Sequence, residues 1–269
     1  MNTDKDRLKR FITALIPHGF IDHRRHQITL RRLGIANHRI KRRRQASEIT
    51  SSVAECSFAL WPFELRQAPY DWTLVDVGAN IGGFCAAALS LVKPAELVAF
   101  EPQPSCQKLL RHAVKGHNNC RIIQAAVGNR CGIITLNCTR DSKFASVLTP
   151  LKDVQKHYIT GSNEVEDRME VPLVTLDGVL SSVDRIGLLK IDVQGFELEV
   201  LKGAVDVLQR TNAVLLEINY VPHYQNAVSF EDLFSFLQER NFTLRGVSAP
   251  FGDRYGAPLW ADAIFCRKA

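Results

Sequence analysis

The sequence lacks any apolar run that approaches the roughly 20 residues needed for a membrane-spanning helix. Its one modest apolar run, residues 11–16, is interrupted by Pro17 and Gly19. Neither a signal peptide nor a transmembrane span is therefore expected. The seven cysteines include no Cys-x-x-Cys pair. This disfavours a zinc site and predicts reduced thiols in a cytoplasmic protein.

Two nucleotide-binding fingerprints are also missing. The absence of a Gly-x-x-x-x-Gly-Lys-Ser/Thr loop excludes the P-loop triphosphate hydrolases. The Gly-x-Gly-x-x-Gly fingerprint of dinucleotide-binding proteins is incomplete, because Asn80 stands two residues after Gly78. An asparagine side chain would crowd a pyrophosphate, although it can hydrogen-bond a smaller ligand. A nicotinamide or flavin dinucleotide is therefore the less favoured cofactor.

Positive charge is concentrated near the N-terminus. Residues 1–44 contain thirteen lysines and arginines against three acids, a net charge of +10, whereas the whole chain carries +6. The remainder is therefore mildly acidic. Apolar residues at helical spacing between 8 and 15 precede the densest basic stretch. We expect a basic, partly helical N-terminal arm over residues 1–70 and a globular domain over residues 71–269.

From Trp72 onward, short apolar runs alternate with amphipathic segments. This pattern predicts an α/β fold with a doubly wound, mostly parallel sheet and an antiparallel hairpin at its edge. An insertion of about 60 residues, with strand-like alternation at 132–137 and 169–175, should separate the third and fourth parallel strands. The expected parallel strands are 73–77, 96–100, 121–125, 187–192 and 213–218, the hairpin strands 242–247 and 259–266, and the helices 82–92, 104–115, 195–209 and 230–239.

The first βαβ unit carries a candidate cofactor site. After the first strand, the loop from Asp76 to Gly82 contains Gly78 and Asn80, and glycine at 78 permits a tight turn close to a ligand. Glu101 ends the second strand, near the spacing at which an acid accepts hydrogen bonds from both ribose hydroxyls. The two features together favour an adenosine-bearing ligand. A plain glycine-rich strand-to-helix turn is the structural alternative.

Four segments resemble the FkbM family of methyltransferases, in the same order. They are Val75 to Gly82, Ala99 to Pro102, Val174 to Asp177, and Leu189 to Glu197 followed by Leu201 to Ala204. The resemblance spans roughly residues 72–266 and leaves out the basic arm. It implies a Rossmann-like class I methyltransferase that uses S-adenosyl-L-methionine to methylate a hydroxyl on a sugar or natural product. The family usually has glutamate where this chain has Gln194.

Candidate catalytic residues lie at the ends of the fourth and fifth parallel strands. Asp192 is the first candidate for binding or deprotonating an acceptor hydroxyl, with capping of the following helix as an equally weighted alternative. Glu217 and His223 are further candidates, although a surface-loop histidine is the simpler interpretation of His223. No metal ligand is assigned, since only two suitable carboxylates are visible.

Missing motifs constrain the acceptor. The fourth strand is followed by no Asn/Asp-Pro-Pro-Tyr/Phe segment, which binds planar amines in amino-methyltransferases, and by no Pro-Cys nucleophile for pyrimidine carbon. A small-molecule or carbohydrate hydroxyl is thus the favoured target. An RNA methyltransferase that uses the basic arm to bind phosphates is the alternative, although the arm interleaves few aromatics with its bases. A non-catalytic protein that only binds cofactor is a third possibility.

Overall fold

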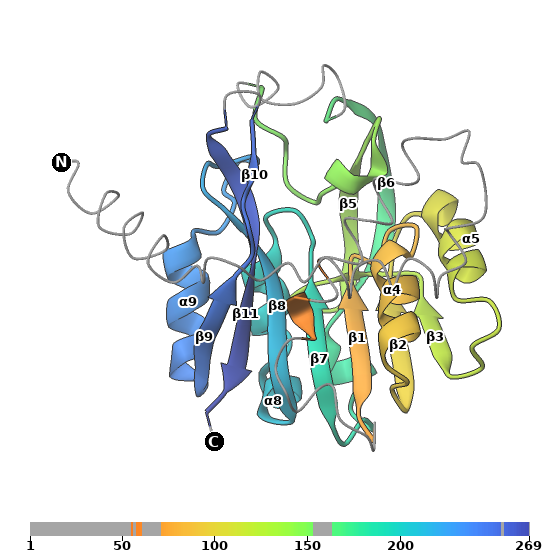
Figure 1. Cartoon of the computed structure of the whole chain (residues 1–269). Coiled ribbons are helices and arrows are strands. Elements are labelled where there is room, and N and C mark those ends of the chain that lie inside the picture. The colour runs from red at the N-terminus through yellow and green to blue at the C-terminus, as the bar shows by residue number, and fades with distance from the viewer. Residues whose placement is uncertain (1–54, 56–57, 61–70, 153–162, 254–255, 269) are drawn as a thin grey trace, which may run out of the picture.

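The computed structural model describes residues 55, 58–60, 71–152, 163–253 and 256–268 (Figure 1). Its main element is an eight-stranded sheet with the order β10-β11-β8-β7-β1-β2-β3, in which β9 also pairs with β11. The strands are β1 Thr73–Val77, β2 Glu96–Phe100, β3 Cys120–Ile123, β7 Ile186–Ile191, β8 Thr211–Asn219, β9 Phe242–Val247, β10 Phe251–Gly252 and β11 Pro258–Arg267.

The predicted fold class is confirmed. Strands β3, β2, β1, β7 and β8 run parallel, and β11 pairs antiparallel with β8 and β9, so that β9 and β11 form the predicted edge hairpin. All five predicted parallel strands are present, with ends shifted by at most two residues. The order reverses at β1, which pairs with β2 on one side and β7 on the other. Ligands of such sheets bind at the carboxyl ends of the strands beside that switch point.

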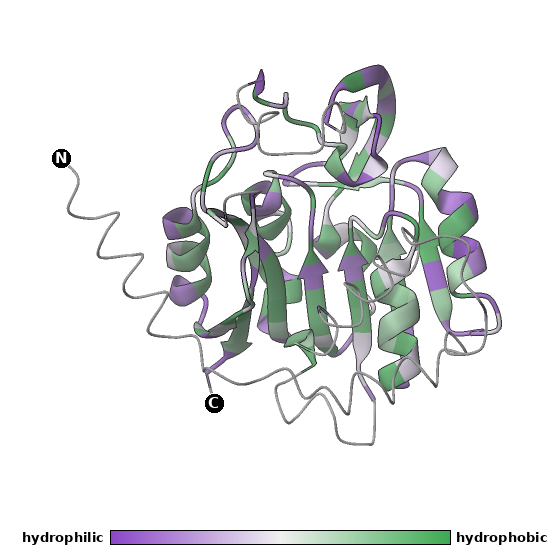
Figure 2. Cartoon of the chain, turned by 45° about the horizontal axis from the view of Figure 1, so that its top comes forward, coloured by the Kyte–Doolittle hydropathy of each residue, from purple (hydrophilic) through white to green (hydrophobic). Residues whose placement is uncertain are grey.

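Helices cover both faces of the sheet. One face packs against α4 Gly83–Leu91 and α5 Pro104–Ala113, which together bury Phe84, Leu89 and Leu110. The other face packs against α6 Leu176–Val179, α7 Glu197–Lys202, α8 Val205–Gln209 and α9 Phe230–Glu239. In Figure 2 the central strands are hydrophobic along most of their length and hydrophilic at their tips. The carboxyl edge of the sheet is therefore where polar side chains collect.

The helix predicted over 195–209 is wrong as a single element, because it divides into α7 and α8. The break occurs at Gly203 and Ala204. A Cβ at residue 203 would lie 2.0 Å from the carbonyl oxygen of Gly128, so the chain turns there against a loop of the insertion between β3 and β7. This contact joins residues 75 positions apart, and helical periodicity carries no information about it.

The insertion between β3 and β7 forms a second, three-stranded sheet. Its strands are β4 Ala126–Val127, β5 Gly132–Thr139 and β6 Val165–Val174, in the order β4-β6-β5. Strands β5 and β6 cover the two predicted strand-like segments except residue 175, and they pair antiparallel. A short 3-10 helix, η3 Ser142–Phe144, follows β5. Figure 1 shows this sheet above the carboxyl ends of the central strands, with β10 rising on the other side of the same edge.

Part of the predicted N-terminal arm packs on the sheet. Ala59 and Leu60 are buried in the same cluster as Phe84 and Leu110, and Phe58 lies near Gly246. The folded unit therefore includes residues 58–60, which the sequence analysis placed before the domain boundary. The basic stretch itself lies outside the described residues, so its separation from the domain stays a prediction. In the described part of the chain, no helix is long and apolar enough to cross a membrane.

Candidate functional site

The glycine loop after β1 lies directly against the end of β7. Gly78 has a φ of +86°, and a Cβ there would lie 1.9 Å from the carbonyl oxygen of Asp192. Gly82 has a φ of +85° and packs against α5, where a Cβ would lie 2.8 Å from Leu110 Cδ1. Both positions thus require glycine for conformation and for space. The loop is held between β7 and α5, with its backbone at the carboxyl edge of the sheet.

Glu101 is bound to this loop, as its predicted role in one shared site requires. Its Oε2 accepts a hydrogen bond of 2.8 Å from the Asn80 backbone N–H, and its Oε1 accepts one of 2.8 Å from Gln103 N–H. Burial raises the pKa of Glu101 to about 7, although these two backbone donors oppose the shift. A carboxylate offers about four lone-pair sites, so each oxygen keeps acceptor capacity for a ligand hydroxyl.

Asn80 has a φ of +47°, a left-handed conformation that asparagine tolerates better than most residues. Its Oδ1 accepts hydrogen bonds from Ile81 N–H at 2.7 Å and from Ser142 Oγ at 3.2 Å. The loop is therefore linked to η3 in the insertion. The Asn80 side chain therefore orders the loop at the position where the dinucleotide-binding fingerprint has its second glycine.

Asp76 is fully buried at the end of β1. Its Oδ2 accepts a hydrogen bond from Cys85 Sγ at 3.0 Å. Its Oδ1 receives no hydrogen bond from the described residues and lies 3.9 Å from Lys190 Nζ. Burial raises the pKa of Asp76, while Lys190 opposes that shift. A buried acceptor atom without a donor suits a cationic or hydrogen-bonding ligand group.

Lys190 is the cation at the centre of this acidic cluster. Its Nζ lies 3.0 Å from Asp192 Oδ2 and 3.3 Å from Glu55 Oε1. Burial alone would lower the pKa of Lys190, but Asp192, Glu55 and Asp76 outweigh it and raise the pKa well above its ordinary value. Sequence reasoning missed Glu55, since no local motif marks it. Burial raises the pKa of Glu55 to about 8, although Lys190 acts in the opposite direction.

Asp192 lies between two side chains of its own segment. Its Oδ2 pairs with Lys190, and its Oδ1 accepts a hydrogen bond of 2.9 Å from Gln194 Nε2. Helix α7 has no side-chain cap, and Glu197 instead accepts hydrogen bonds from Val193 N–H at 3.2 Å and Gly195 N–H at 3.0 Å. The helix-capping alternative for Asp192 is therefore wrong, because Glu197 orders the turn.

Glu217 lies on the neighbouring strand, and Gln194 connects it to Asp192. Gln194 Nε2 is 3.4 Å and 3.5 Å from the two Glu217 carboxylate oxygens. Glu217 also pairs across the sheet with Asp262 of β11. Burial raises the pKa of Glu217 well above its ordinary value, and Asp192, Glu197 and Asp262 raise it further. Two of the three predicted catalytic side chains are thus brought into one hydrogen-bonded group.

His223 is 4% exposed, so the simpler interpretation of a surface-loop histidine is wrong. Its ring lies edge-to-face with Trp260, with 5.8 Å between the centroids, and its carbonyl oxygen accepts a 2.9 Å hydrogen bond from Leu151 N–H. Trp260 pairs with Asn219 at the end of β8, two residues beyond Glu217. His223 therefore packs at the β8 and β11 side of the same edge. Among the described residues, no group of three or more His, Cys, Asp or Glu side chains is arranged to hold a metal.

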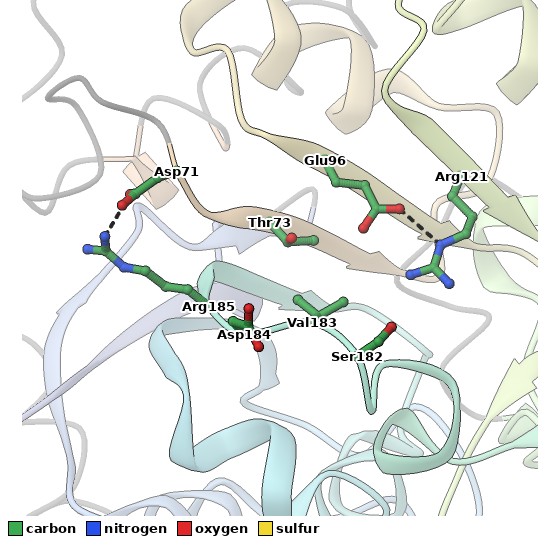
Figure 3. A pocket seen from close by; sticks show the side chains of 8 residues that line it. All are labelled: Asp71, Thr73, Glu96, Arg121, Ser182, Val183, Asp184 and Arg185. Atoms are coloured by element: carbon green, nitrogen blue, oxygen red, sulfur yellow. Dashed lines mark hydrogen bonds and ion pairs between the residues drawn. The ribbon is translucent and has the colours of Figure 1, made fainter.

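A cavity of about 470 Å³ opens at the opposite edge of the sheet, at the amino ends of the strands (Figure 3). Two ion pairs lie in its lining, from Arg121 to Glu96 at 3.1 Å and from Arg185 to Asp71 at 2.7 Å. None of the predicted cofactor or catalytic residues lines it. The lining residues are Asp71, Thr73, Glu96, Arg121, Ser182, Val183, Asp184 and Arg185.

Comparisons with known proteins agree with this geometry. The model of the methyltransferase FkbM domain matches residues 76–244. Hexuronic acid methyltransferase AglP of Haloferax volcanii is 31% identical over 157 residues, 58% of this chain and 59% of that protein. The 31-O-demethyl-FK506 methyltransferase FkbM of Streptomyces tacrolimicus is 32% identical over 169 residues, 54% and 65% of the two chains.

A methyltransferase FkbM from Methylobacillus flagellatus KT shares the fold, with a TM-score of 0.50 and 14% identity over 78% of this chain and 47% of that one. The chain spans about three fifths of the length of the curated relatives it matches. The sheet order, the glycine loop and the acid at the end of β2 define a class I methyltransferase fold. The chain belongs to the FkbM methyltransferase family.

Proposed function

We propose that this protein transfers a methyl group from S-adenosyl-L-methionine to a hydroxyl oxygen of a sugar or natural-product acceptor. The observation that carries the proposal is the direct contact between the glycine loop and the end of β7. It supports a site for adenosine beside a candidate base, since Gly78 touches the backbone of Asp192. The names of the relatives support the acceptor class, because they include a hexuronic acid methyltransferase and a demethyl-FK506 methyltransferase.

The residues present fit this cofactor. Glu101 would accept hydrogen bonds from the ribose hydroxyls, because each of its oxygens has acceptor capacity left beyond one backbone N–H. Gly78, Asn80 and Gly82 would shape the loop around the ligand. Asp76, with a buried oxygen that receives no hydrogen bond from the described residues, would face the cationic part of the ligand. When bound, the cofactor supplies a methyl group on an already activated sulfonium.

The protein's own contribution would be alignment, exclusion of water and removal of a proton. Asp192 would accept the proton of the acceptor hydroxyl as that oxygen attacks the methyl carbon. Lys190 would keep the Asp192 carboxylate in place through the 3.0 Å ion pair. Glu217 and His223 would line the acceptor side of the edge, where β8 ends and β11 begins.

Calorimetric titration with S-adenosylhomocysteine tests the cofactor half of the proposal. Glu101→Ala should weaken binding by about 1–3 kcal/mol, because it removes hydrogen bonds to a charged acceptor. Glu96→Ala is the matched control, since Glu96 lies at the other end of the same strand and lines the distant cavity. Equal affinity in the parent and Glu101→Ala would remove Glu101 from the site.

Transfer of tritium from labelled S-adenosylmethionine to a panel of uronic acids, neutral hexoses and macrolide alcohols tests the catalytic half. Asp192→Asn keeps the shape of the side chain and removes its charge. Turnover should then fall by roughly 10²–10⁴-fold, the usual contribution of a general base, while S-adenosylhomocysteine affinity stays within twofold. A loss below tenfold would assign Asp192 an orienting role and shift the search to Glu217 and His223.

A further inference from the structure

Gln194 occupies a strained and closely held position in the loop between β7 and α7. Its φ is +59°, in the left-handed region that a residue other than glycine adopts only with backbone strain. The residue is buried, and its carbonyl oxygen accepts a 2.8 Å hydrogen bond from Ser146 Oγ of the insertion. Such strain persists only where the surroundings fix the conformation, and it is commonest at functional sites.

The Gln194 amide has one end toward the carboxylates and the other toward Tyr224. Nε2 donates to Asp192 Oδ1 at 2.9 Å and faces both Glu217 oxygens, at 3.4 Å and 3.5 Å. Oε1 accepts a 2.9 Å hydrogen bond from the Tyr224 hydroxyl, which also lies 3.0 Å from the Phe144 carbonyl oxygen. The Tyr224 hydroxyl and the carboxylates favour the same orientation of the amide, because the carboxylates accept hydrogen bonds from the NH₂ group while Oε1 is left toward the hydroxyl donor.

The charges around this amide explain why its orientation matters. The Glu217 carboxyl group on β8 interacts electrostatically with three other acids, and Lys190 is the cation that acts on the same group. The three acids are Asp192, Glu197 on α7 and Asp262 on β11. A reversed amide would present Oε1 to two carboxyl groups. A carboxylate at residue 194 would add a further negative charge at the same place, with repulsion that the low local dielectric strengthens.

We propose that Gln194 and Tyr224 are positioning residues. They aim the Asp192 carboxylate at the acceptor hydroxyl and separate its negative charge from the Glu217 carboxyl group. The inference rests on the proposed methyl transfer. In that step the acceptor oxygen forms a bond to the methyl carbon and the carbon–sulfur bond breaks, with its electron pair going to sulfur. The hydroxyl proton passes to Asp192, whereas Gln194 and Tyr224 take up no proton.

The first test needs no acceptor. In the full chain saturated with S-adenosylhomocysteine, the Gln194 side-chain NH₂ is followed by ¹H–¹⁵N NMR. Slowly exchanging amide protons are expected in the parent and in Tyr220→Phe, a matched change in the same loop. Tyr224→Phe should accelerate their exchange and shift both resonances, because Oε1 loses its donor. Unchanged NH₂ signals in Tyr224→Phe would overturn the proposal, whether or not the protein transfers methyl groups.

The second test uses methyl transfer to the best acceptor of the panel described above. Tyr224→Phe should lower kcat by roughly 10- to 100-fold, the effect of a small displacement of a reacting group, with the Kd for S-adenosylhomocysteine unchanged. Gln194→Glu should move the acid limb of the pH profile of kcat to higher pH by about one unit. If Tyr224→Phe matches Tyr220→Phe in kcat, and Gln194→Glu leaves the pH profile in place, the two residues are structural only.

Discussion

Gly78 and Asp192 are in direct backbone contact, although they lie 114 positions apart in the chain. Asp192 N–H donates a 3.0 Å hydrogen bond to Val77 carbonyl oxygen, and the Asp192 carbonyl oxygen fills the space that a Cβ at residue 78 would need. The glycine loop and the candidate base therefore meet at one junction between β1 and β7. A change on either side of the junction should affect both.

Gly78→Ala should disrupt this junction. Its Cβ would lie 1.9 Å from the Asp192 oxygen, and φ at this residue is +86°. We expect a loss of stability of about 2–4 kcal/mol, from backbone strain and a backbone clash together, and loss of measurable S-adenosylhomocysteine binding. Gly116→Ala is the matched control, because its φ is +94° but no atom lies within 4 Å of the added Cβ. Urea denaturation measures the stability of both variants. Equal losses of stability in the two would show that the contact with Asp192 contributes nothing to the stability of the fold.

Cofactor binding should depend on pH through Glu101. Burial raises the pKa of this carboxyl to about 7 in the free protein, and hydrogen bonds from ribose hydroxyls would favour the ionised form. Lowering the pH through 7 protonates the Glu101 carboxylate, which then accepts hydrogen bonds from the ribose less well. The affinity for S-adenosylhomocysteine should therefore fall by about tenfold between pH 8 and pH 6. Glu101→Gln should bind more weakly than the parent at pH 8 and lose most of this pH dependence. A parent affinity that is constant over this range would mean that Glu101 does not meet the ligand.

Strand positions, sheet class and the glycine loop after β1 could be predicted because their signals are local. Leu74 to Val77 form a buried run, and glycines at 78 and 82 stand where the chain must turn with positive φ. Glu101 was found by its spacing from Asp76. The identity of the residues thus carried enough information for the first βαβ unit, where each feature depends on neighbours close in sequence.

Other features depend on contacts between distant segments, and the sequence shows no trace of them. Helix α7 ends because Gly203 meets Gly128, and His223 is buried because Trp260 of β11 packs against it. Glu55 reaches Lys190 from a segment 135 residues earlier. Composition and periodicity describe each of these segments alone, so they predicted a longer helix and an exposed histidine, and they gave no sign that residues 58–60 pack on the sheet.

Stability should rise as the pH falls from 8 toward 5, in part through Glu197. Burial raises the pKa of Glu197 to about 7, above its ordinary value of 4.5. A raised folded-state pKa contributes stability that is complete below the unfolded pKa and is lost as the pH rises through the folded one. The contribution of Glu197 should therefore disappear between about pH 4.5 and pH 7.

Glu197→Gln isolates this contribution, because glutamine Oε1 can still accept the hydrogen bonds from Val193 and Gly195. The free energy of unfolding, measured in urea at pH 5, 6, 7 and 8, should vary with pH less steeply in the variant than in the parent. Glu199→Gln, a substitution on the same helix at a carboxyl that pairs with Lys202, is the control. Parallel curves for the parent and Glu197→Gln would contradict the assignment.

The N-terminal boundary of the folded unit should lie before residue 58. Leu60 is 3% exposed and Ala59 is 0% exposed, and both pack in the cluster that joins α4 to the sheet. Glu55 adds a 3.3 Å ion pair with Lys190, whose charge is buried and needs partners.

A chain that starts at Ser52 should therefore fold and bind S-adenosylhomocysteine like the full chain. A chain that starts at Trp61 should lose about 3–5 kcal/mol of stability, since it removes the buried Leu60 side chain, the buried Ala59 and a partner of Lys190. Leu60→Ala in the full chain separates packing from charge and should cost about 2–4 kcal/mol, while Glu55→Gln reports on the ion pair with the packing intact. Urea midpoints that coincide for the chains starting at 52 and 61 would show that residues 58–60 are not part of the cooperative unit.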